Sequence, residues 1–152
     1  MKSMNEESQS VDALVTLQER MVNLIKQLQM PLIETSMVIG NHIKQLMKSL
    51  NEYSSESGVL FPDKVTSPWE LNMDNDTNSQ ITMELDKILS IVDNDRMDIL
   101  ATLIRVTLIE TELDLSEALL ALRMWEHLAR SQLAAATSPG QLFSPLVMPE
   151  EW

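Results

Sequence analysis

The feature that most constrains the fold of this chain is its hydrophobic spacing, which repeats every three to four residues along two long stretches. The first stretch covers residues 10–52 and the second covers residues 79–136. Such spacing places apolar side chains on one face of an α-helix. Strand signals are missing, because valine is sparse and no alternating run ends in an Asn-Gly or Asp-Gly turn. The sequence therefore predicts an all-α protein, either a long antiparallel helical hairpin or a small helical bundle with coiled-coil-like seams.

The first stretch carries a regular apolar seam in its N-terminal half. Five residues at alternating spacings of three and four form this seam: Leu14, Leu17, Met21, Leu24 and Leu28. Pro31 interrupts the pattern, because proline lacks a backbone N–H and clashes with the preceding helical turn. Since Gln29 and Met30 are poor helix N-caps, we expect one kinked helical arm over residues 10–52 rather than two helices.

The second stretch contains a segment that is apolar on nearly all sides. Within residues 99–109 the only charge is Arg105, which predicts a helix buried on several sides. Asp93 predicts a break before this segment, and Asp114 with Glu117 resembles a capping box, so a further joint there is an open alternative. When two helical arms pack together, each buries only one stripe of its apolar side chains. We therefore expect a second copy or folded-back segments to cover the remainder, and a dimer or higher oligomer at micromolar concentration.

Three segments lack helical patterning. Residues 1–9 are polar and are expected to form a flexible N-terminus. Residues 53–78 hold several serines, a glycine and two prolines and are expected to form an acidic loop. Residues 137–152 contain three prolines and one glycine, which predicts a proline-rich tail outside the regular helices.

Five of the six aromatic residues lie in these irregular segments. For Phe61 and Trp69 we favour packing against the chain's own core. For the tail, packing on its own helices and docking on a partner are both open, because ordering a terminal segment costs entropy. Our hypothesis is that the tail docks on a partner or a neighbouring copy through Phe143, Leu146 and Trp152.

The charge balance excludes several classes of partner. The chain has 11 basic and 23 acidic side chains, a net charge of −12, which argues against nucleic acid and against anionic membrane surfaces. No apolar run approaches the roughly 20 residues of a membrane span. The polar N-terminus lacks the apolar core of a secretory signal, so we expect a cytoplasmic protein, with nuclear location and export by a dedicated machine left open.

Motifs for catalysis and metal binding are missing. The chain has no cysteine, which excludes thiol catalysis and cysteine-type zinc sites. Neither His42 nor His127 follows a glutamate by three residues, as a di-metal carboxylate bundle requires. Asp74 and Asp76 have the spacing of an EF-hand loop, but Ser79 stands where glycine is needed. We therefore expect no enzymatic activity, no cofactor and no bound metal.

These patterns favour a non-enzymatic protein–protein interaction protein: an oligomerising adaptor, assembly factor or chaperone-like subunit of a larger complex, in a homo- or hetero-oligomer. The expected partner contacts are the seam residues and the three tail residues named above. An alternative is an acidic decoy that occupies a basic protein surface through residues 52–98, which carry eleven acidic and three basic side chains. A third alternative is an enzyme or ligand-binding bundle whose site leaves no motif.

Overall fold

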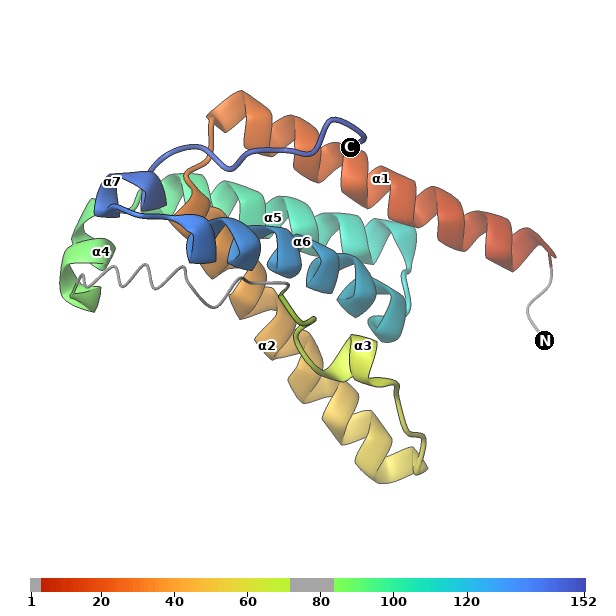
Figure 1. Cartoon of the computed structure of the whole chain (residues 1–152). Coiled ribbons are helices and arrows are strands. Elements are labelled where there is room, and N and C mark those ends of the chain that lie inside the picture. The colour runs from red at the N-terminus through yellow and green to blue at the C-terminus, as the bar shows by residue number, and fades with distance from the viewer. Residues whose placement is uncertain (1–3, 72–83) are drawn as a thin grey trace.

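Helices dominate the computed structural model, which describes residues 4–71 and 84–152 (Figure 1). In chain order the helices are α1 (Met4–Leu28), α2 (Leu32–Ser57), α3 (Asp63–Thr66), α4 (Leu85–Ile91), α5 (Asn94–Thr111), α6 (Leu115–Ala135) and α7 (Pro139–Leu142). Helix α2 packs mainly on α6, and α1 packs mainly on α5. The all-α prediction is confirmed, and the architecture is the helical bundle.

The expected kinked arm over residues 10–52 is wrong, because the chain forms two helices that run in different directions (Figure 1). Gln29 adopts a left-handed conformation with φ 47°, and the Met30 N–H donates to the Ile25 carbonyl at 3.0 Å. This is a Schellman ending of α1, formed without the usual glycine. Pro31 then precedes α2, where a missing N–H is tolerated. We call residues 29–31 the elbow.

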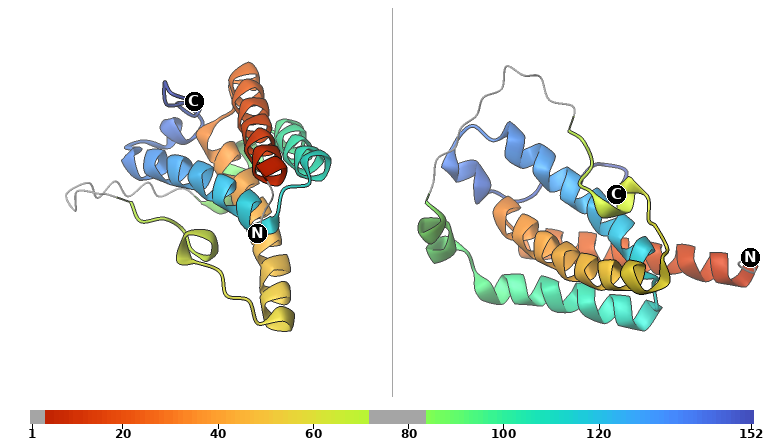
Figure 2. Two further views of the ribbon diagram at one scale, coloured as in Figure 1. Left: turned by 90° about the vertical axis from the view of Figure 1, so that its right-hand side faces the viewer. Right: turned by 90° about the horizontal axis from the view of Figure 1, so that it is seen from below.

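The expected second arm over residues 79–136 is likewise divided. Asp93 lies between α4 and α5, where a break was predicted, and it caps α5 by accepting from the Arg96 N–H at 3.1 Å. Glu112 has φ 54° and ends α5, and the Asp114 carbonyl accepts the first bond of α6 from Ala118 at 2.9 Å. Helices α5 and α6 therefore run in opposite directions (Figure 2). The joint left open at Asp114 is present.

A buried ion pair fixes the start of α2 against the start of α5. The Glu34 side chain is 1% exposed, and its two oxygens accept from Arg96 Nε at 2.7 Å and Nη2 at 2.6 Å. The Asp93 backbone N–H also lies 3.4 Å from Glu34 Oε2. The hydrogen bond to Glu34 raises the pKa of Arg96 above its ordinary value, against the opposing effect of burial. Bidentate geometry of this kind holds both helix ends in one orientation.

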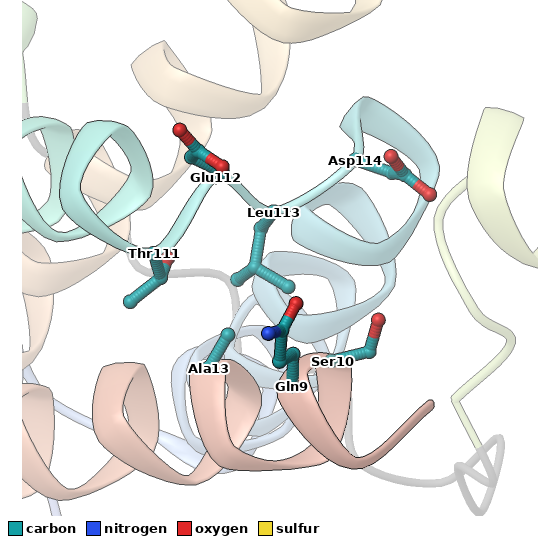
Figure 3. Close-up of a pocket in the computed structure, with 7 residues that line it drawn as sticks. All are labelled: Gln9, Ser10, Ala13, Thr111, Glu112, Leu113 and Asp114. Carbon is teal, nitrogen blue, oxygen red and sulfur yellow. The ribbon is translucent and has the colours of Figure 1, made fainter. Parts of the chain in front are cut away.

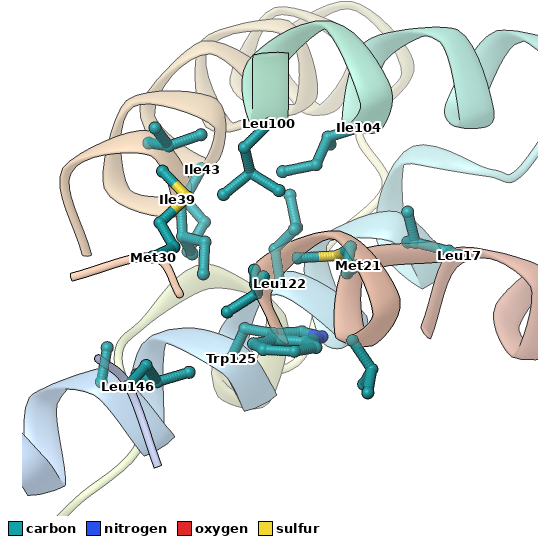
Figure 4. Packing of buried hydrophobic residues seen from close by; sticks show 14 of the residues in the cluster. Leu17, Met21, Met30, Ile39, Ile43, Leu100, Ile104, Leu122, Trp125 and Leu146 are labelled. Atoms are coloured by element: carbon teal, nitrogen blue, oxygen red, sulfur yellow. The ribbon is translucent and has the colours of Figure 1, made fainter. Parts of the chain in front are cut away.

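The core lies where α1, α2, α5 and α6 meet, and Figure 4 shows their side chains pointing into the same space. Trp125 of α6 is buried in this core, and its indole N–H donates to Gln18 Oε1 of α1 at 2.8 Å. Leu100 and Ile104 of α5 are also fully buried. A second copy is therefore not needed to cover this face of α5.

The segment after α2 lies on α6, and part of the expected loop over residues 53–78 is helical, since α2 continues to Ser57 and α3 follows. Residues 72–78 lie outside the described ranges.

Two arginines of α6 hold this segment. The guanidinium of Arg123 donates to the Val65 carbonyl at 3.1 Å, and that of Arg130 donates to the Trp69 carbonyl at 2.8 Å. Phe61 packs against the core and the Trp69 ring lies against His127, so the interpretation that these two aromatics pack on their own chain agrees with the structure.

The tail over residues 137–152 begins with the single turn of α7 and then runs extended past the elbow (Figure 1). The Leu32 N–H donates to the Ser144 carbonyl at 2.8 Å, and the Leu146 N–H donates to the Met30 carbonyl at 3.1 Å. The side chain of Gln132 on α6 holds both backbone groups of Val147, at 2.6 and 3.0 Å. These bonds tie the tail to both the elbow and α6.

The ion pair yields a first prediction. Replacing Arg96→Met leaves the buried Glu34 carboxylate without its charged partner. We expect a loss of about 3 kcal/mol in the free energy of unfolding, the lower end for a broken buried pair because water reaches Arg96. The matched control is Arg105→Met on the exposed side of α5, which should change stability by less than about 0.5 kcal/mol. Equal losses in urea unfolding of the two variants would contradict this role.

The tail yields a second prediction. Leu146 is 7% exposed and its neighbour Val147 is 69% exposed. We expect Leu146→Ala to lower the free energy of unfolding by about 2–4 kcal/mol, since it empties a core position. Val147→Ala removes no buried atoms from the side chain and should cost less than about 0.5 kcal/mol. Denaturant titration followed by circular dichroism measures both, and a neutral Leu146→Ala would show that the tail is not part of the core.

Candidate protein-binding surface

The residues predicted to contact a partner through α1 are largely used inside the bundle. Leu17 and Met21 are buried in the core, and Leu24 is half-buried against it. Leu14 and Leu28 are also half-buried. The seam is thus the inner face of α1, because α5 and α6 supply the apolar cover that we had expected from another chain.

The tail anchors are also engaged within the chain, so the expectation that the tail docks elsewhere is wrong. Leu146 belongs to the core, and Phe143 is half-buried. The Trp152 ring meets the Trp125 ring edge-on at a centroid distance of 4.6 Å. Burial of Leu146 and Trp152, two backbone–backbone hydrogen bonds and two bonds to the Gln132 side chain offset the entropy of ordering the tail.

A hollow of about 300 Å³ lies between α1 and the joint of α5 with α6 (Figure 3). Its lining residues are Gln9, Ser10, Ala13, Thr111, Glu112, Leu113 and Asp114. In Figure 3 the Leu113 side chain points toward α1, whereas the carboxylates of Glu112 and Asp114 point in different directions. The two carboxylates therefore do not converge on one point of the hollow.

The histidines lie apart and face backbone groups. His42 Nδ1 is 3.1 Å from the Val38 carbonyl of its own helix, and His127 Nε2 is 3.2 Å from the Glu70 carbonyl. Within the described ranges, no three histidine, aspartate or glutamate side chains come close enough to hold a metal ion. The EF-hand-like spacing at Asp74 and Asp76 lies outside those ranges.

The clearest uncovered apolar surface in the described part of the chain is a stripe on the outer side of α5. It consists of Ile99, Val106 and Ile109, which are 48%, 41% and 71% exposed. Their spacing of seven and three residues places them along one side of the helix. Water-exposed side chains of this size in a regular row are typical of an interaction surface. We call these three residues the α5 stripe.

The opposite side of α5 explains why the stripe faces outward. Leu100, Ile104 and Thr107 are buried against the bundle. Arg20 of α1 donates to Thr107 Oγ1 at 3.1 Å and to Glu110 Oε2 at 2.8 Å, which links α1 to the C-terminal end of α5. The Glu34–Arg96 ion pair fixes its N-terminal end. The stripe is therefore presented by a helix held at both ends.

The other exposed apolar side chains lie on a short helix, in a connection, in a pair or singly, as do Tyr53 on α2 and Leu120 on α6. Leu85, Leu89 and Ile91 lie on α4, a helix of seven residues with no buried side chain. Leu60 lies in the connection after α2. Val11 and Val15 form one pair on α1. The α5 stripe is longer than the pair on α1 and, unlike α4, belongs to a helix with a buried face.

No family model matches the sequence, and neither a curated protein nor a solved structure matches it significantly. Within the described ranges, every helix is too short or too polar to cross a bilayer. The function must therefore be inferred from the surface itself.

The two sides of α5 yield a third prediction. Ile104→Asp buries a carboxylate in the core and should reduce the free energy of unfolding by more than about 4 kcal/mol. Ile109→Asp places the same group in water and should cost less than about 1 kcal/mol, mainly through the helix dipole. Thermal unfolding by circular dichroism compares the two, and an unfolded Ile109→Asp variant would show that the stripe is part of the core.

Proposed function

We propose that this chain is a non-enzymatic binding subunit, an adaptor or assembly factor, that joins a larger complex by docking a partner protein on the α5 stripe. The observation that supports the proposal is the row of exposed apolar side chains on a helix whose other face is fully packed. Leaving these side chains in water is unfavourable, and a partner would remove that cost.

The dimensions of the stripe suit a helical partner. Residues 99–109 span about 15 Å of helix, or roughly three turns. Helices that pack at a shallow angle contact one another over such a length through side chains at spacings of three, four and seven. The stripe is straight because α5 contains neither proline nor glycine.

Neither the hollow beside α1 nor the two histidines support the enzyme alternative. The hollow beside α1 has diverging carboxylates, and the histidines face backbone carbonyls. The acidic decoy differs from the adaptor in a testable way. A decoy that acts through charge alone would bind without the apolar side chains of the α5 stripe, whereas an adaptor would need them.

The fourth prediction tests the α5 stripe against a matched site. Ile109 and Val147 are almost equally exposed, at 71% and 69%, but lie on different surfaces. We expect Ile109→Asp to lose the partner proteins that co-purify with the full chain from its native source, whereas Val147→Asp retains them. Quantitative mass spectrometry of the two purifications against the unsubstituted chain measures this.

The outcomes separate the candidate functions. Partners that remain bound to Ile109→Asp but dissociate in high salt would favour the decoy and contradict the adaptor. Partners lost equally from both variants would contradict a specific role for the α5 stripe. Circular dichroism of each variant confirms that loss of binding is not loss of fold.

A further inference from the structure

We infer that the occupant of the α5 stripe is an amphipathic helix of a different protein, with lysine or arginine beside its apolar seam, and not a second copy of this chain. This inference rests on the proposed function and names the chemistry of the partner. It is carried by the charges that surround the stripe.

The chain segment that carries the stripe is acidic. Residues 84–114 contain eight acidic and three basic side chains, a net charge of −5. On α5 itself, Arg96 is engaged by Glu34, which leaves the exposed Arg105 as the other base of that helix. Exposed carboxylates lie toward both ends of the stripe: Asp95 and Asp98 near its start and Glu112 near its end. Glu110 is also exposed, but Arg20 of α1 pairs with it.

A second copy fits this arrangement poorly in either orientation. Antiparallel pairing of two α5 helices about the middle of the stripe would place Asp98 of one copy beside the acidic C-terminal end of the other, which holds Glu112 and the Arg20-paired Glu110. Parallel pairing would place each carboxylate beside its own equivalent. Like charges brought together across an interface oppose association, and the net charge of −12 on each whole chain adds to the repulsion.

A basic amphipathic helix satisfies both features of the surface. Its apolar seam would cover Ile99, Val106 and Ile109. The long stems of lysine or arginine can lie along apolar surface while their charged heads reach carboxylates at the rim. Because acids flank both ends of the stripe, basic residues at both ends of the partner helix would find counter-charges. The apolar contact provides the association, and the charges select the partner.

The test uses the full chain and two designed helical peptides of about 20 residues, long enough to span the stripe. Both peptides carry the same leucine and isoleucine seam, flanked by lysine in one and by glutamate in the other. Fluorescence anisotropy measures their binding. We expect the lysine-flanked peptide to bind at least about tenfold tighter, with the preference falling as salt rises.

Substitutions in the full chain test whether the preference for the lysine-flanked peptide depends on the α5 stripe and the carboxylates beside it. Ile109→Asp should weaken the lysine-flanked peptide strongly, and Val147→Asp should leave its affinity unchanged. The double variant Asp98→Lys with Glu112→Lys should keep the apolar stripe yet reduce or reverse the preference between the peptides. A preference that survives this charge reversal would overturn the inference, because the selecting charges would lie elsewhere.

Two further results would overturn it. Equal or tighter binding of the glutamate-flanked peptide would show that the rim does not select basic partners. A dimer of the full chain at micromolar concentration in light scattering that Ile109→Asp converts to a monomer would show that a second copy covers the stripe. If native partners still depend on Ile109 in either case, the proposed function stands and only the identity of the occupant is wrong.

Discussion

The buried ion pair between Glu34 and Arg96 is the constraint on which the arrangement of this bundle depends. It joins the first turn of α2 to the first turn of α5, two segments far apart in the sequence. Because the carboxylate is removed from water, only a narrow range of geometries satisfies it. Arg20 completes the restraint at the other end of α5. These two contacts, together with the buried face of α5, favour the outward direction of Ile99, Val106 and Ile109.

The apolar core and the Glu34–Arg96 ion pair restrain different properties of α5: the core keeps it buried, and the ion pair limits its rotation. The apolar contacts of Trp125, Leu100 and Ile104 are non-directional, and alone they would allow α5 to rotate while remaining buried. The bidentate bond of Arg96 is directional and removes that freedom. Residues 99–109 are apolar on nearly all sides, yet one side of this segment faces the core and the other faces water.

Local signals explain which parts of the fold were predictable. The helical class follows from periodicity. The break at Asp93 follows from a side chain that caps the next turn, and the break at Asp114 from a residue type that is favoured at helix N-caps. The ending at Gln29 was missed because the left-handed position carries glutamine where glycine is usual. The face of α5 that is exposed was also missed, because a helix apolar all round gives no periodic signal of its orientation. The residues of α1 and the tail that were expected to contact a partner pack within their own chain instead. Their apolar character indicates that they are covered, but it does not indicate which chain covers them.

The contacts of the tail with the elbow have a consequence for the order of folding. Met30 and Leu32, on either side of Pro31, bond to the backbone of residues 144–146. The angle between α1 and α2 is therefore held by a segment that the ribosome adds long after both helices have emerged. Contacts of such large sequence separation form late, since closing the intervening loop costs entropy before any bond is made. We therefore expect the elbow to have only its local bonds during synthesis and to become more rigid when residues 144–146 reach it.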